Sequence, residues 1–443
     1  MNRRIFSAMM TVGVLTVLAK AASASKDLAT AYQFGAGDAL DAFLIAWLVP
    51  TFAINLVSGS LNAALIPSYI QVLNQAGAEA AQRLFASTMV CNLVLMFLVI
   101  VSLTFAGPYL LPLLASGFNQ DKLALTGDLY DVLLPCLMLT GVATTWHAVL
   151  NARERFAMSA VTPSVSALVT TMLIVLCADR MGIYALAWGA VAGFAVEAMI
   201  LGWWLRRAGI SLLPRWHGVT APLRQVWAQY APMLAGAFLM GGTDIVGQSL
   251  AASLGSGSNA ALSYGSKLPS LVVGVGTLAV STAVLPYFSR LVASGDFRAL
   301  RHTVITYARL VVCATIPLTF LTVYYSEPLV HALFQRGAFT AEDAQRVAWV
   351  QSLYLLQIPP YTLGILAVRL ISSLQANHIL MWSSASNLMV SLLLNYVLMQ
   401  WLSVAGIALA TSLMYLFSMI FLVYMASRLI NERESLGRII SAA

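Results

Sequence analysis

Long apolar runs constrain this 443-residue sequence more than any other feature. About twelve runs of roughly 18 to 25 residues recur along the chain, each long enough to cross a hydrocarbon core about 30 Å thick as a helix. Because 60% of the residues are apolar and only 9% are charged, the charges cannot cover a water-soluble globule. The predicted fold class is therefore all-α integral membrane. The runs centre on residues 5–25, 41–66, 84–106, 130–150, 157–178, 183–205, 225–253, 260–288, 303–325, 345–372, 379–401 and 404–427.

The distribution of basic residues explains the net charge of +7. With the N-terminus placed in the cytoplasm, alternate loops and tails carry sixteen arginines, whereas the opposite loops carry only Lys122 and three arginines. This asymmetry follows the positive-inside rule, so it predicts a multi-pass protein with both termini cytoplasmic and needs no nucleic acid partner. Arg3 and Arg4 before the first run would also suit a signal peptide. Since Lys20 interrupts the region where cleavage would occur, we expect a retained first helix.

Two halves of the sequence share landmarks. The polar residues 207–223 are predicted to be a cytoplasmic linker between a six-helix lobe of residues 1–206 and a second six-helix lobe of residues 224–443. Under a shift of about 219 residues, the matching features are Pro50 and Pro67 with Pro269 and Pro286, Gly35–Gly37 with Gly255–Gly257, and Leu114–Phe118 with Phe334–Phe339. Six helices return the chain to the same side, which is typical of parallel-repeat transporters whose substrate site lies between the lobes.

Ionisable side chains occur inside the apolar runs, where each costs a few kcal/mol and usually carries function. They include Lys20, Lys26 and Asp27 in the first run, Asp41 at the start of the second, Glu197 in the sixth, Asp244 in the seventh and Lys267 in the eighth. Lys20 and Lys26 lie about 120° apart around a helix and about 9 Å apart along it, so they could line one cavity wall. Lys267 precedes Pro269, which should bend the helix into a candidate gate. Three lysines against few acids favour an anionic substrate, and phosphate is the natural candidate.

Several of these side chains have a simpler interpretation. Lys26 could pair with Asp27 near the membrane interface or extend its ammonium group to water. Asp244 and Glu197 could take up a coupling cation or proton, because a carboxylate in low dielectric does either readily, or they could neutralise a lysine. His147 is more simply a hydrogen-bonded interfacial histidine than a proton relay.

Enzyme and metal chemistry have little support. The sequence contains no HExxH, GxSxG or paired-acid motif in a loop, which argues against a membrane-embedded glycan polymerase or ligase. The four cysteines fall singly in separate runs, without a CxxC pair, and are predicted to be packing residues. We expect no catalytic residue, no metal site and no cofactor.

Four segments carry a resemblance to a known family. They are Lys26-Asp27 through Phe34-Gly35-Ala36-Gly37 to Asp41-Ala42-Phe43, then Gly59 with Pro67, then Tyr264 with Lys267-Leu268, and Leu333 to Ala344. In these segments the sequence resembles the MurJ/MviN family of lipid II flippases, within the multidrug/oligosaccharidyl-lipid/polysaccharide exporter superfamily. The resemblance implies a V-shaped, two-lobed helical transporter that moves undecaprenyl-pyrophosphate-linked peptidoglycan precursor from the inner to the outer leaflet by alternating access.

The family also implies roles for individual residues. Arginines at the positions of Lys20, Lys26 and Lys267 face the cavity and bind substrate pyrophosphate in the family, and Asp27 and Asp41 correspond to cavity or gating acids. Lysine keeps the positive charge but lacks the planar fork that grips phosphate.

Other family features depart in this sequence. The family's basic pair in the second helix falls at Ile54 and Asn55, and its nearby acid falls at Ser58. The family's sodium-site acid aligns nearer Gly247 than Asp244. The two extra C-terminal helices of the family have no room after Arg428.

These observations leave three transport interpretations in order. The first is lipid II translocation, coupled to Na⁺, H⁺ or the membrane potential, in the bacterial inner membrane. The second is translocation of another polyprenyl-linked glycan, of the exopolysaccharide or O-antigen type. The third, a drug or metabolite antiporter, would favour an acidic cavity. The expected partners are the lipid-linked anionic glycan and membrane lipids, with no obligate protein partner.

Overall fold

The computed structural model describes the backbone of residues 2–442 and the side chains of residues 15–434, apart from 240, 278, 279, 282, 283, 285 and 286. The side chains of Arg3, Arg4, Arg438 and the repeat landmark Pro286 therefore lie outside the described residues. All regular structure in the described backbone is helical, which confirms the predicted all-α class.

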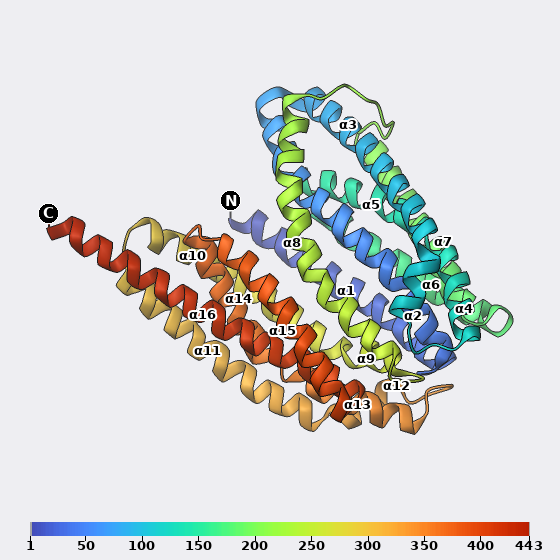
Figure 1. Ribbon diagram of the computed structural model, residues 1–443. Helices are drawn as coiled ribbons and strands as arrows, with labels where there is room; N and C mark the ends of the chain where they lie inside the picture. The colour runs from blue at the N-terminus through green and yellow to red at the C-terminus, as the bar shows by residue number, and fades with distance from the viewer. Residues whose placement is uncertain (1, 443) are drawn as a thin grey trace. The chain divides into compact units, whose positions relative to one another are not determined.

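The helices follow one another along the chain, and the longest connection is the irregular segment 208–220 between α7 and α8 (Figure 1). They are α1 (Asn2–Phe34), α2 (Asp38–Ala53), the π-helix η1 (Ile54–Gly59), α3 (Ser60–Leu114), α4 (Gln120–Leu133), α5 (Pro135–Ala152), α6 (Phe156–Met181), α7 (Tyr184–Arg207), α8 (Ala221–Ala252), α9 (Ser258–Gly265), α10 (Lys267–Ala293), α11 (Phe297–Tyr324), α12 (Ser326–Phe334), α13 (Ala341–Leu355), α14 (Ile358–Ser373), α15 (His378–Leu402) and α16 (Val404–Ala442).

A kink divides the longest helix, α3, so that its two parts can belong to different membrane crossings. Gly77 has a φ of 83° inside α3, so that α3 is two helices joined at a kink, and only glycine adopts this conformation without strain. Within the described residues, eight stretches have the length and hydropathy to cross a membrane, and the first of them, Asp38–Leu114, contains the kink at Gly77. Together with α1, α8 and α10, these stretches correspond to the twelve predicted crossings.

Large apolar side chains are exposed along these helices. Phe105, Tyr109, Phe320 and Trp401 are each more than 70% exposed. Such surfaces would be unfavourable in water and are expected where a helix faces lipid. The chain is therefore a multi-pass membrane protein.

The helices form two compact units. Unit 1 contains residues 1–241 together with the loop residues 255–257 and 336–340, and unit 2 contains residues 242–254, 258–335 and 341–443. The predicted linker, residues 207–223, includes the irregular segment between α7 and α8, whereas the boundary between the compact units falls later, at residues 241 and 242 in α8. The reason is packing, because Leu223, Val226 and Tyr230 of α8 belong to the apolar core of unit 1.

Each unit has its own apolar core. In unit 1, α6 packs against both α1 and α7, and Leu65, Phe85 and Leu201 lie in a core shared by α3, α5, α7 and α8. In unit 2, α14 packs against α10, α11 and α16 (Figure 1). Phe288 and Leu370 are buried in the core of this unit.

Candidate functional site: charged side chains in the membrane helices

The two lysines of α1 are accessible rather than buried. Lys20 is exposed, and Lys26 lies two turns further along the helix with about a third of its side chain exposed. The Nζ atom of Lys26 lies 3.9 Å from Oδ1 of Asp27, whose side chain is 16% exposed. The pairing of Lys26 with Asp27, one of the two interpretations of the sequence, is thus confirmed. At this distance the pair is loose, and the ammonium group still reaches solvent.

The third lysine begins a helix in unit 2. The chain breaks between α9 and α10 at Ser266, Lys267 is the first residue of α10, and Pro269 lies in the first turn of that helix. Pro269 is tolerated there because the first turn has no intrahelical partner for its missing N–H. The sequence predicted a bend at Pro269, whereas the helix is interrupted three residues earlier, at Ser266, and Lys267 is exposed.

The acid at the start of α2 is in a buried ion pair. Asp41 has no exposed surface, and its Oδ2 lies 2.9 Å from Nζ of Lys122 and accepts a hydrogen bond of 2.7 Å from the backbone N–H of Gly257. Lys122 also donates to Asp38 at 2.6 Å and is itself only 8% exposed. We call Asp38, Asp41, Lys122 and Gly257 the Asp41 cluster. Asp41 satisfies its charge within this cluster and does not face open solvent.

Sequence reasoning missed the role of Lys122. The positive-inside analysis assigned it to a loop, and that assignment is wrong, because Lys122 lies in the first turn of α4, where its backbone N–H is capped by the Asn119 side chain. One signal was available. The chain has only four lysines, and the other three are the membrane candidates Lys20, Lys26 and Lys267.

Two loops of the second half of the sequence complete this part of unit 1. Gly257 binds Asp41, and the N–H of Ala338 donates to the carbonyl of Tyr32 at 2.8 Å. Gly35 and Gly337 make the approach feasible, with φ values of 59° and 61°. A Cβ on Gly337 would lie 2.3 Å from the Tyr32 carbonyl oxygen, so no larger residue fits. The glycine motifs quoted for the family thus contact the end of α1.

Glu197 is engaged in a polar contact between helices. It is 5% exposed, and its Oε1 lies 3.2 Å from Nε2 of His147, whose Nδ1 lies 2.8 Å from the Ser159 hydroxyl. These residues come from α7, α5 and α6 of unit 1. The simpler interpretation of His147 as a hydrogen-bonded histidine is confirmed, and Glu197 has a fixed partner.

Asp244 has different surroundings in unit 2. It is exposed and lies close enough to Tyr354 and Tyr415 to interact with them electrostatically. The Tyr354 side chain hydrogen-bonds Thr411, and the Tyr415 ring packs edge-on against Tyr361, with ring centroids 4.8 Å apart. A carboxylate with nearby phenol oxygens supplies the hard oxygen ligands that a small cation needs. Within the described residues, no group of three or more His, Cys, Asp or Glu side chains could hold a metal ion.

Ile54, Asn55 and Ser58, which replace charged residues of the family, coincide with an irregular stretch of helix. These three residues lie in η1, the π-helix that separates α2 from α3. Asn55 is exposed, whereas Ser58 is 1% exposed, with its hydroxyl 3.7 Å from the sulfur of Met96. Single-turn π segments recur at functional sites, because they shift the side-chain register of the helix that follows.

One protein family matches this sequence along most of its length. A family model described as "Lipid II flippase MurJ" matches residues 30–441. The probable lipid II flippase MurJ of Thermotoga maritima is 26% identical over 399 residues, covering 90% of this chain and 80% of the relative. The corresponding protein of Rhizobium meliloti is 24% identical, covering 80% of this chain and 68% of the relative.

Solved structures share the fold. A lipid II flippase MurJ in an inward closed conformation matches with a TM-score of 0.80 at 18% identity, covering 97% of this chain and 91% of that one. An inward-facing multidrug resistance MATE family transporter matches with a TM-score of 0.81 at 10% identity, covering 97% and 99%. At these identities the structural matches show the fold alone.

Proposed function

Because the chain belongs to the family of lipid II flippases MurJ, we propose that it translocates lipid II from the inner to the outer leaflet of the bacterial inner membrane by alternating access. The observation that carries the proposal is the family match over residues 30–441. The placement of the lysines supports it, because Lys20 and Lys267 are exposed on helices that cross the membrane. The cytoplasmic location of both termini is part of the proposal and rests on the positive-inside asymmetry.

The chemistry of the substrate head group fits these cations. A pyrophosphate carries charge that must be compensated outside water, and ammonium groups of Lys20, Lys26 and Lys267 supply it as mobile point charges. Each lysine can follow a moving phosphate, since its flexible stem needs no fixed planar geometry. We expect charge to matter more than hydrogen-bond geometry at these three positions.

For the driving force, we propose that Asp244 is the coupling group. It combines a carboxylate with the neighbouring Tyr354 and Tyr415 in a membrane helix of unit 2, so that it can bind Na⁺ or a proton. Glu197 is the weaker candidate, because His147 already contacts its carboxylate at 3.2 Å. Transport measured with a Na⁺ gradient, a pH gradient or a membrane potential imposed separately would assign the energy source. Asp244→Asn should abolish the transport that the effective gradient or potential drives.

The direct test is translocation in proteoliposomes. Purified protein is reconstituted with fluorescent lipid II, and the fraction accessible to a membrane-impermeant quencher is followed with time. Lys20→Ala and Lys267→Ala should each slow translocation at least tenfold, while the arginine variants stay within a few-fold of the wild type. Arg309→Ala is the matched control, because Arg309 is an exposed cation of α11 outside the proposed site. Accessibility no faster than in protein-free liposomes would refute the function.

A second substrate is favoured by one observation. The family's basic pair and nearby acid are replaced by Ile54, Asn55 and Ser58, so that three charges of the family's second helix are missing. This difference favours a related polyprenyl-linked glycan with a head group unlike that of lipid II. The same liposome assay with an undecaprenyl-pyrophosphate-linked exopolysaccharide unit distinguishes the two substrates, because only the transported lipid becomes accessible to the quencher.

A further inference from the structure

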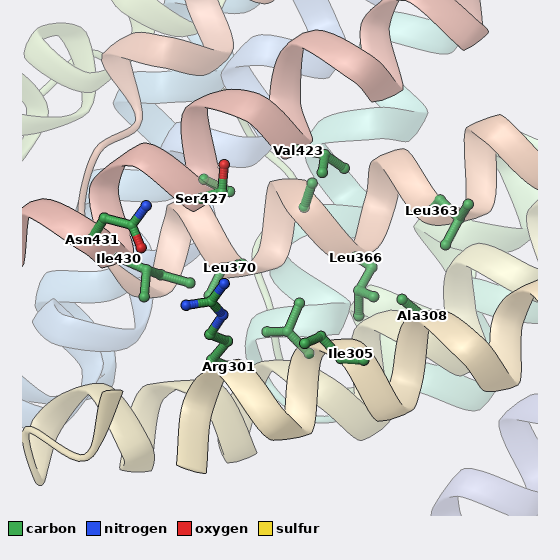
Figure 2. A pocket seen from close by; sticks show the side chains of 13 residues that line it. Arg301, Ile305, Ala308, Leu363, Leu366, Leu370, Val423, Ser427, Ile430 and Asn431 are labelled. Atoms are coloured by element: carbon green, nitrogen blue, oxygen red, sulfur yellow. The ribbon is translucent and has the colours of Figure 1, made fainter. Parts of the chain in front are cut away.

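A cavity in unit 2 is lined by none of Lys20, Lys26 and Lys267. It has a volume of about 310 Å³ and is bounded by α11, α14 and α16. Figure 2 shows Arg301 and Ile305 of α11 facing Ser427, Ile430 and Asn431 of α16 across it, with Leu370 of α14 between them. Its volume lies at the lower limit of ordinary ligand pockets.

The cavity is apolar inside and polar at one end. Leu366, Leu370 and Ile430 are buried and form its floor, whereas Arg301 and Asn431 are exposed at its mouth. Since all three enclosing helices are apolar membrane segments, the floor would be filled by hydrocarbon and not by water.

The depth of the cavity matches a chain that enters from the membrane interface. Arg301 lies near the start of α11, which begins at Phe297, and Ala308 lines the cavity two turns further along the same helix. This separation corresponds to about 10 Å along the helix axis. A ligand would therefore place a polar group at the interface and extend a hydrocarbon chain toward the membrane interior.

The charge at the mouth defines the polar group. No Asp or Glu occurs among the described residues that line the cavity, and Arg301 is its only charged lining residue there. Glu432, the acid that follows Asn431, pairs with Arg428 at 3.2 Å and does not line the cavity. A guanidinium presents two parallel donors to phosphate oxygens, and the Asn431 amide adds a further donor.

From these features we infer that the cavity binds an anionic phospholipid of the bilayer. One acyl chain occupies the space between α11, α14 and α16, and the phosphate lies against Arg301. The volume suits a segment of one chain and is too small for a glycan head group. Bound lipid would fill the space between α11 and α16 and so stabilise unit 2 in membranes rich in anionic lipid. The inference does not depend on the proposed function, because it uses none of the substrate lysines.

The experiment compares lipids and variants of the full chain. Detergent-purified protein is titrated with phosphatidylglycerol or with phosphatidylcholine of identical acyl chains, and bound lipid is counted by native mass spectrometry. The wild type should retain one phosphatidylglycerol at least tenfold more tightly than phosphatidylcholine. Arg301→Ala should remove this preference, whereas Arg298→Ala should keep it, since Arg298 is exposed on the same helix but does not line the cavity.

A second variant tests the chain as distinct from the head group. Ala308→Phe should fill the deep end of the cavity and reduce phosphatidylglycerol binding while leaving Arg301 in place. Thermal unfolding of each variant without lipid shows whether the variant is folded. If Ala308→Phe is unfolded, Ile305→Phe, at an exposed position that also lines the cavity, takes its place. Equal retention of both lipids by the wild type, or equal losses in the Arg298 and Arg301 variants, would overturn the inference. Displacement of phosphatidylglycerol by undecaprenyl phosphate at equal concentration would overturn it too, because it would assign the cavity to the substrate tail.

Discussion

Replacing Lys122 with methionine tests whether the Asp41 cluster stabilises unit 1. Methionine has a length similar to that of lysine and fills the same space, but it removes the ammonium group 2.9 Å from the Asp41 carboxylate. Asp41, with no exposed surface, then keeps its hydrogen bond from Gly257 but loses this buried counter-charge. Leaving one member of a buried ion pair without its partner costs about 3–5 kcal/mol.

The contribution of Asp38 to the same cluster is much smaller. Its side chain is 59% exposed, and an ion pair at that exposure contributes about 0–1 kcal/mol despite the distance of 2.6 Å to Lys122. For a unit of this size, 1 kcal/mol corresponds to about 2–4 °C in Tm. We therefore expect Lys122→Met to lower Tm by about 6–20 °C and Asp38→Asn by at most about 4 °C.

The assay is thermal unfolding of the detergent-purified protein, followed by tryptophan fluorescence. Asp41→Asn and the double variant Lys122→Met/Asp41→Asn complete a thermodynamic cycle. The double variant should unfold at a higher temperature than Lys122→Met alone, because no charge remains buried and asparagine can still accept from Gly257. Equal Tm changes for Lys122→Met and Asp38→Asn, or strictly additive effects in the cycle, would refute the reasoning.

Two further predictions concern the glycine loops and the lysines. Gly337→Ala should lower Tm more than Gly77→Ala. Both residues have a positive φ, but only at Gly337 would the new Cβ lie 2.3 Å from a backbone oxygen, whereas nothing lies within 4 Å at Gly77. Equal shifts in Tm would show that the loop moves aside freely. A water-soluble amine reagent applied to the folded protein should modify Lys20 and spare Lys122, since Lys20 is exposed and Lys122 is only 8% exposed. Peptide mass spectrometry measures the modification of each lysine, and modified Lys122 would contradict its burial.

Length and hydropathy along the chain suffice to predict the class of this protein and the character of its membrane segments. Whether a segment enters the bilayer depends on its own length and hydropathy, so that the twelve crossings could be predicted without knowledge of their neighbours. The same local logic identified Lys20, Lys26 and Lys267 as charges that need an explanation. It also offered the Lys26–Asp27 pair as one interpretation and predicted an irregularity close to Lys267, because the residues concerned are neighbours along the chain.

Pairing between charges that are far apart in the sequence is visible only in the folded bundle. Lys122 and Asp41 are 81 residues apart, and His147 and Glu197 are 50 residues apart. Such contacts depend on which helix faces pack together, and no local pattern records this. The same holds for the loop residues that belong to unit 1 and for the cavity beside Arg301, whose walls come from three helices. Helix formation in a membrane is a property of each segment, whereas the charge environment inside it is a property of the packed bundle.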